Sequence, residues 1–166
     1  MKKETTLILN HIEIEHKIRR IAFQIYENNI EEKEIVLAGI ARSGYIFAEK
    51  LKECLENISP IQIILCEVKV NKKNPLDRVE TSLEKEQYSN KSIIIVDDVL
   101  NSGATLIYGI KHFLNVPVKK LQTAVLVDRS HKKYPIKADF KGISLSTSLS
   151  ERVKVSLAKE YKAELL

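Results

Sequence analysis

Apolar residues in the first half of the chain alternate between helical spacing and short continuous runs. Between Glu13 and Asn28 they recur every three or four positions, which predicts an amphipathic helix. The continuous run from Ile35 to Ile40 predicts a buried strand. A second helical pattern extends from Ile46 to about Leu55, and the segment from Ile61 to Val70 is rich in β-forming residues. Helix and strand therefore alternate in this half of the chain.

The second half repeats this alternation. Ser92 to Val96 is the clearest apolar run and predicts a buried strand. Helical spacing begins near Ser102 to Thr105 and continues to Leu114, and Leu121 to Val127 predicts another buried strand. Strands that alternate with helices are typical of a mostly parallel sheet with helices on both faces. We therefore expect an α/β fold built on a mostly parallel, twisted sheet.

Three of the predicted strands end in polar segments. Ala41 to Gly44 follows the first, Asp97 to Thr105 the second, and the third ends at Asp128. Ligands of such sheets bind beyond the carboxyl ends of the strands, so we expect these segments to meet at one edge. The polar segment from Asn71 to Arg78 is bounded by turn residues and predicts a long mobile loop, a kind of segment that often has a function.

Length and composition limit the class of protein. The chain has 166 residues, 44% of them hydrophobic and 30% charged, which suits a single globular domain over residues 1–166. Cys54 and Cys66 cannot form a disulfide framework or a zinc site by themselves, so we interpret them as reduced thiols. No apolar run approaches the ~18 residues of a membrane span, and Met1 to Glu4 leads to no signal-type apolar segment. These features predict a soluble, cytoplasmic protein without a membrane partner.

The net charge of +5 is unevenly distributed. Residues 111–141 contain eight lysines and arginines but only two acidic residues, Asp128 and Asp139. A basic stretch favours an anionic partner such as a phosphate-bearing substrate or RNA. A solvated basic surface would have the same composition, so charge alone does not decide between these interpretations.

The candidate chemistry is concentrated between Asp97 and Thr105. Asp97 and Asp98 are adjacent carboxylates, which repel each other unless cationic or hydroxyl groups meet them. Ser102, Gly103 and Thr105 follow at a helix start, where free backbone N–H groups and the helix dipole favour an anion. Gly103 lets the backbone approach that anion closely. A ligand with hydroxyls, or a metal, next to a phosphate matches both features, and a ribose 5-phosphate fits that description.

Two other nucleotide-binding motifs do not match this sequence. Gly39 and Gly44 have the spacing of a P-loop, but Tyr45 and Ile46 stand where that motif needs lysine and a hydroxyl residue. The five glycines include no two that are two positions apart, so the dinucleotide-binding fingerprint is absent. A capped helix after a buried strand would explain Ser102, but it would not explain two carboxylates and a glycine in the same turn.

The segment from Val96 to Thr105 resembles the phosphoribosyl pyrophosphate (PRPP) motif of type I phosphoribosyltransferases. The resemblance implies that family's fold, with a small hood at about residues 129–166, and implies that Asp97 and Asp98 hold the ribose hydroxyls as catalytic residues. It implies a 5-phosphate loop formed by Asn101, Ser102, Gly103, Ala104 and Thr105. It implies a pyrophosphate loop formed by Ala41, Arg42, Ser43 and Gly44. It also implies a lid over about residues 70–88 that includes Lys72, Lys73 and Arg78.

The downstream sequence is similar to the pyrimidine operon regulatory proteins that double as uracil phosphoribosyltransferases. The similar segments are Ala124–His131, Pro135–Gly142, Ser146–Ser148 and Ser150–Val155. In related 6-oxopurine enzymes, a lysine at the position of Lys137 meets the exocyclic oxygen of the base, and Val153 would pack on the base. The regulatory proteins also bind pyrimidine messenger RNA and respond to uridine nucleotides. That property would place His131, Lys132 and Lys133 on a basic RNA-binding face.

The resemblance implies an enzyme that moves 5-phosphoribose from PRPP to a nucleobase, with uracil the expected base and Mg²⁺ bound mainly through PRPP. Asn101 stands where 6-oxopurine enzymes have an aspartate that accepts a proton, so purine salvage is a less favoured alternative. A regulator that binds RNA, with weak or no catalysis, is the other alternative. The chain differs from the pyrimidine regulators at Ala104, where arginine is usual, and in the position of Arg42, which is shifted by one residue. The family commonly forms homodimers or homotetramers.

Overall fold

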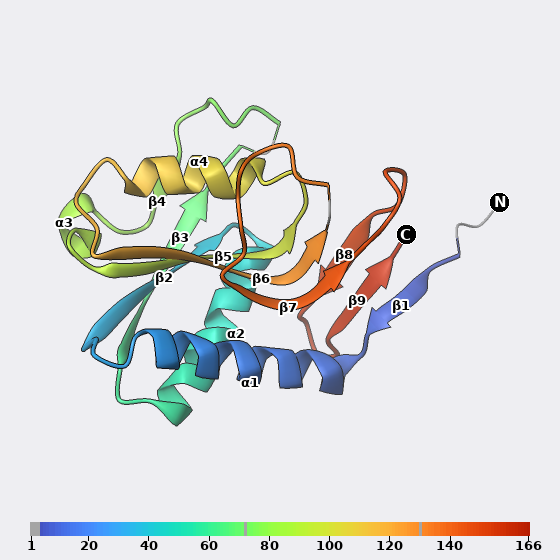
Figure 1. The fold of residues 1–166 in the computed structure, drawn as a ribbon, viewed down its shortest axis with the longest axis horizontal. Helices are drawn as coiled ribbons and strands as arrows, with labels where there is room; N and C mark the ends of the chain where they lie inside the picture. Colours follow the sequence, from blue (N-terminus) through green and yellow to red (C-terminus); the bar gives the residue numbers. More distant parts are fainter. Residues whose placement is uncertain (1–3, 72, 130) are drawn as a thin grey trace.

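The computed structural model describes residues 4–71, 73–129 and 131–166. Its centre is a six-stranded sheet with the order β4-β3-β2-β5-β6-β7 (Figure 1). Neighbouring strands are parallel except β4, which is antiparallel to β3. The strands are β2 (Glu34–Ile40), β3 (Gln62–Lys69), β4 (Glu80–Thr81), β5 (Ser92–Leu100), β6 (Lys120–Arg129) and β7 (Phe140–Leu145). The predicted α/β fold with a mostly parallel sheet is therefore confirmed.

Helices cover both faces of this sheet, as expected. Helices α1 (His11–Asn28) and α2 (Ser43–Ile58) lie on one face and α4 (Ala104–Phe113) lies on the other (Figure 1). Leu37 of β2 belongs to the core beneath α1 and α2, and its neighbour Val36 belongs to the core beneath α4. A strand buried on both faces needs apolar residues at successive positions, which explains the continuous apolar runs. In the part of the chain that the structure describes, no helix has the length and apolarity needed to span a bilayer.

Helix α1 begins at His11 because Asn10 caps it. The Asn10 side chain accepts a hydrogen bond from the Glu13 N–H at 2.9 Å, and the Glu13 carboxylate accepts one from the Asn10 N–H at 2.8 Å. This reciprocal capping box satisfies two backbone donors at the helix start. The cap fixes the point where the chain leaves the preceding strand and turns along the sheet.

A second, small sheet lies beside the central one. It has the order β1-β9-β8, and all its pairs are antiparallel. Its strands are β1 (Thr6–Leu9), β8 (Val153–Ser156) and β9 (Lys162–Leu165). The small sheet therefore does not coincide with the hood expected at about residues 129–166. Strand β7 of that range belongs to the central sheet, and β1 from the other end of the chain joins the small sheet. Local patterns did not predict β1, because its pairing partner is distant in sequence.

Part of the segment expected as a lid, at about residues 70–88, is packed against the central sheet. Strand β4 pairs with β3, and Tyr88 in α3 (Lys85–Tyr88) is only 1% exposed. Val79 and Leu83 also pack against the core beneath α4. These apolar side chains anchor residues 79–88 to the sheet, whereas most of the described residues at 71 and 73–78 are exposed. Lys72, one of the three expected lid cations, lies outside the described residues.

Candidate active site

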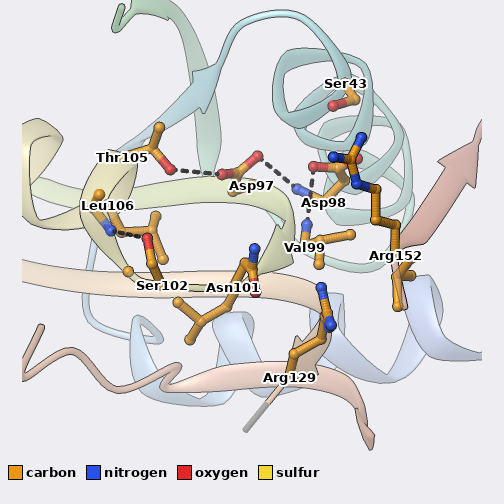
Figure 2. A pocket seen from close by; sticks show the side chains of 14 residues that line it. Ser43, Asp97, Asp98, Val99, Asn101, Ser102, Thr105, Leu106, Arg129 and Arg152 are labelled. Carbon is orange, nitrogen blue, oxygen red and sulfur yellow. Dashed lines mark hydrogen bonds between the residues drawn. The ribbon is translucent and has the colours of Figure 1, made fainter. Parts of the chain in front are cut away.

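The carboxyl ends of β2, β5 and β6 meet at one edge of the sheet, and a cavity of about 490 Å³ opens there (Figure 2). Its lining comes from four parts of the chain. These are Ser43 at the start of α2, the segment Asp97–Leu106, Arg129 at the end of β6, and Arg152 with Val153 beside the small sheet. The polar segments that follow the three strands therefore converge as predicted.

Asp97 and Asp98 both line the cavity, from within β5. The strand continues to Leu100, whereas the apolar run predicted an end at Val96, because its pairing with β6 extends past the two carboxylates. Asp97 is 2% exposed, and it accepts hydrogen bonds from the Asp98 N–H at 2.9 Å and the Thr105 hydroxyl at 3.4 Å. Asp98 is less buried and accepts the Val99 N–H at 2.9 Å. The backbone and a hydroxyl therefore orient both carboxylates.

The loop from Asn101 to Thr105 borders the same cavity with all five of its residues. Gly103 has a φ of 86° and stands at the N-cap position of α4, which begins at Ala104. The Ser102 hydroxyl oxygen accepts a hydrogen bond from the Ala104 N–H at 3.2 Å. The first turn of a helix has N–H groups without helical partners and the positive end of the helix dipole. This side of the cavity therefore favours an anion such as a phosphate.

The segment from Ala41 to Gly44 reaches the cavity only through Ser43. Arg42 is exposed and Ala41 is half-buried, and the peptide bond between them is cis. Helix α2 begins at Ser43 rather than near Ile46, so half of the expected pyrophosphate loop is helical. Gly44 makes this possible: a Cβ at Gly44 would lie 2.7 Å from the Val96 carbonyl oxygen, so only glycine lets the helix start so close to β5.

Two arginines that were not selected from the sequence also line the cavity (Figure 2). Arg129 is 5% exposed, and its guanidinium donates to the Thr147 hydroxyl at 2.9 and 2.7 Å and to the Glu151 carbonyl at 2.9 Å. Its position at the end of an apolar strand could have identified this arginine as a candidate site residue, because a charge buried there needs polar partners. Arg152 is exposed and has no such local signal, because the pairing of its backbone with Leu166 places it at the cavity.

The two residues expected to contact a base are separated in this structure. Val153 lines the cavity, whereas the Lys137 side chain is exposed and does not. The Lys137 carbonyl accepts a hydrogen bond from the Thr123 hydroxyl at 2.5 Å, which fixes the backbone but leaves the side chain free to turn. Of the expected lid cations, Lys73 and Arg78 are exposed and lie outside the cavity lining.

The three residues expected on an RNA-binding face have different surroundings. The His131 ring nitrogen Nε2 lies 2.6 Å from the Thr147 carbonyl oxygen. Lys132 is ion-paired with Asp128 at 3.5 Å, and Lys133 is exposed. Of these three residues, Lys133 is therefore the most accessible to an anionic partner.

Replacing Gly103 with alanine is expected to destabilise the protein by about 1–3 kcal/mol, because backbone strain adds to a steric overlap. A Cβ on this left-handed residue would overlap Cγ2 of Ile136. Urea denaturation would measure the loss. Gly109→Ala is the matched control: a Cβ at Gly109 would make ordinary contacts of 3.4 Å and more, so helix propensity predicts a neutral change or a gain of up to about 1 kcal/mol. Equal losses in the two variants would contradict the special role of Gly103.

Comparisons with known proteins identify the family of the chain. The phosphoribosyl transferase domain family matches residues 4–157. The bifunctional protein PyrR of Fusobacterium nucleatum is 37% identical over 166 residues, covering 95% of this chain and 93% of that protein. The bifunctional protein PyrR of Streptococcus mutans is 32% identical over 157 residues, covering 93% of this chain and 89% of that protein.

Solved structures give the same fold. A hypoxanthine-guanine phosphoribosyltransferase from Bacillus anthracis matches with a TM-score of 0.71 at 22% identity, covering 87% of this chain and 84% of that one. The hypoxanthine phosphoribosyltransferase of Trypanosoma cruzi matches with a TM-score of 0.74 at 18% identity, covering 86% and 83%. From the family match, the identity with the PyrR proteins and this shared fold, we conclude that the chain belongs to the type I phosphoribosyltransferase family.

Proposed function

We propose that this phosphoribosyltransferase transfers 5-phosphoribose from PRPP to uracil and releases pyrophosphate. The observation that supports this most strongly is the set of residues that line the 490 Å³ cavity. The Asp97 and Asp98 carboxylates border it together with the N–H and hydroxyl groups at the start of α4. PRPP presents ribose hydroxyls next to a 5-phosphate, so these two groups of donors and acceptors match neighbouring parts of one substrate.

In the proposed complex, Asp97 and Asp98 accept hydrogen bonds from the ribose hydroxyls. The backbone of residues 101–105 and the hydroxyls of Ser102 and Thr105 bind the 5-phosphate. The pyrophosphate would lie against residues 41–44, with Ser43 the member that already reaches the cavity. Lys73 and Arg78 would contribute only after the exposed connection between β3 and β4 moves over the cavity, so their lid role stays a prediction. The lid role of Lys72, which lies outside the described residues, also stays a prediction.

The reaction is a displacement at the anomeric carbon of the ribose. The bond to pyrophosphate breaks, and positive charge develops on the ribose ring. A nitrogen of uracil then forms the new bond from the opposite face and gives up its proton to water or to the departing pyrophosphate. Carboxylates held beside the ring stabilise that charge without having to reorganise. Binding both substrates in one cavity positions the attacking nitrogen and excludes water.

Magnesium fits this donor set. Mg²⁺ prefers carboxylate and phosphate oxygens and keeps several waters, so Asp97 and Asp98 together with PRPP itself are suitable ligands. When bound, the ion would neutralise charge on the leaving pyrophosphate. The carboxylates would still orient the ribose hydroxyls through hydrogen bonds.

Uracil is the proposed base for two reasons. The chain is similar to bifunctional PyrR proteins over nearly its whole length. In addition, Asn101 lines the cavity where 6-oxopurine enzymes have a carboxylate as proton acceptor, and an amide cannot take that role. Val153 would pack on the base from the position it already holds in the cavity. Lys137 would reach the base only after its exposed side chain turns inward, so its role stays a prediction.

Pyrophosphate release tests this proposal. Purified protein with PRPP and Mg²⁺ receives uracil, hypoxanthine, guanine or adenine in turn, and a reaction without base is the control. We expect release with uracil and background release with the three purines. Release with hypoxanthine or guanine would contradict the proposed base, and failure to bind PRPP in a separate titration would contradict the proposed site.

RNA binding is a second candidate function, suggested by the resemblance to pyrimidine regulators and by the exposure of Lys133, whose backbone N–H donates to the carbonyl of the cavity-lining Ser102. If the protein binds a pyrimidine-operon leader RNA, its affinity should fall steeply with salt, because each phosphate contact releases counterions. A scrambled RNA of the same length is the control. Equal affinity for both RNAs would contradict a regulatory role. Assembly into homodimers or homotetramers also stays a prediction.

A further inference from the structure

A second cavity, of about 320 Å³, lies between the exposed β3–β4 connection and α4. In Figure 1 this connection is the green loop above α4. None of the residues that line this cavity also lines the candidate active site. The lining consists of residues 75–79 of the connection, Lys85 of α3, and Tyr108, Lys111, His112 and Asn115 on or just after α4.

Helix α4 contributes to both cavities with different parts. Its first residues, Ala104 to Leu106, line the candidate active site. Tyr108, Lys111 and His112 are spaced by three and four positions, so they share one face of the helix further along. The second cavity is therefore built on a rigid element, with the β3–β4 connection forming the opposite wall.

Positive charge dominates the second cavity. Arg78, Lys85 and Lys111 line it together with one carboxylate, Asp77. The two Asp77 oxygens accept hydrogen bonds, both at 2.6 Å, from two asparagine side chains of the same connection. Among the residues that the structure describes, none of the three cations has a carboxylate within 4.0 Å. Three unpaired cations around one hollow attract a ligand with more than one negative charge.

His112 also lines this cavity and is half-buried. Burial lowers the pKa of His112, and the charges of Lys85 and Arg78 lower it further. Positive charges from α3 and from the β3–β4 connection thus act on the same ring. A bound anion would oppose them, so its binding should raise the pKa of His112.

The cavity also has an apolar side. Leu76 is 77% exposed, although it is a large aliphatic residue on a loop of polar residues. The Tyr108 ring lines the same cavity and has the Lys111 ammonium 6.0 Å from its centre. An exposed leucine and an aromatic ring beside unpaired cations form a mixed surface that suits an amphipathic ligand.

We propose that this cavity binds a small organic phosphate. The phosphate would lie among Arg78, Lys85 and Lys111, and the apolar part of the ligand would lie against Leu76 and Tyr108. Charge-assisted hydrogen bonds from the guanidinium and the two ammonium groups would supply the affinity. Since the β3–β4 connection and α4 form opposite walls, the bound ligand would join them and restrict the motion of the connection.

Hydrogen exchange with phenyl phosphate as the probe tests this site, because its location can be read from the protected segments. We expect slower exchange of amides in residues 75–79 and 108–115, and weaker protection with inorganic phosphate, which lacks the apolar part. Protection confined to residues 101–106 would overturn the proposal, because the probe would then occupy only the candidate active site. Protection of residues 75–79 and 108–115 by a single-stranded RNA, but not by phenyl phosphate, would overturn it as well.

A charge-matched pair of double variants completes the test. Lys85→Gln with Lys111→Gln is expected to weaken phenyl phosphate binding by about tenfold or more, because two ligand contacts are lost. Lys52→Gln with Lys162→Gln removes the same charge from lysines that are paired with Glu56 and Glu164, away from both cavities. We expect this control to bind the probe as the unchanged protein does. Equal affinity in the two double variants would overturn the proposal.

Discussion

Replacing Asp98 with asparagine is expected to lower the rate of pyrophosphate release from PRPP by about a hundredfold or more, the size of effect seen when one preorganised electrostatic group is removed. The amide keeps the shape of the side chain and can still accept the Val99 N–H, which Asp98 accepts at 2.9 Å. It loses the negative charge that faces the cavity, where positive charge develops on the ribose. Steady-state rates with varied PRPP would separate a loss of kcat from a rise in KM.

Asp98 is a better test than Asp97. Asp97 is 2% exposed and is bonded to the Thr105 hydroxyl, so its replacement would also disturb the loop. Asp139→Asn is the matched control, because Asp139 also accepts a backbone N–H, from Thr123 at 2.9 Å, but lies outside the cavity lining. We expect near-normal rates for that control. An Asp98→Asn protein with an unchanged rate would show that the carboxylate does not stabilise the transition state.

Replacing Arg129 with glutamine is expected to destabilise the protein by about 2–4 kcal/mol, because several hydrogen bonds to a buried charged group are lost together. The guanidinium joins the end of β6 to residues 147–151 through the Thr147 hydroxyl and the Ser148 and Glu151 carbonyl groups. Glutamine is shorter and cannot bond all three. Urea denaturation would measure the change in the free energy of unfolding, and hydrogen exchange would report loosening of residues 147–151.

Arg152→Gln is the control for Arg129→Gln. Both arginines line the same cavity, but Arg152 is exposed and no hydrogen bond or ion pair of its side chain occurs among the described residues. Its replacement should change stability by no more than about 0.5 kcal/mol, as is usual for surface positions. Similar stability of the two variants would mean that the hydrogen bonds of Arg129 are not what holds residues 147–151.

The part of the fold that could be predicted from the sequence is the part that depends on local patterns. Strands buried on both faces are continuous apolar runs, so β2, β5 and β6 were evident without knowledge of their partners. The core of the candidate site was also evident, because Asp97 to Thr105 is one short segment. Its carboxylates and its helix start occupy one cavity because the chain has little freedom between them.

The features that were missed depend on packing between distant segments. Strand β5 extends past Asp97 and Asp98 because β6 continues beside it, and no property of residues 97–100 alone indicates this. Arg152 reaches the cavity because its backbone pairs with that of Leu166. Gly44 permits an early start of α2 only because β5 lies against it. In each case the decisive neighbour is far away in the sequence.

The pairing of β1 with β9 sets an order of events during synthesis of the protein. Thr6 lies opposite Leu165, so the ribosome makes one partner near the start and the other only after all the strands of the central sheet. Contacts this far apart in sequence form slowly, since the intervening chain must be ordered first. The central sheet can therefore assemble on the nascent chain before the small sheet exists. Strand β9 lies between β1 and β8, so both strand pairs of the small sheet can form only after β9 has been synthesised. Because Arg152 is placed by that same step, the candidate active site is among the last parts of the molecule to form.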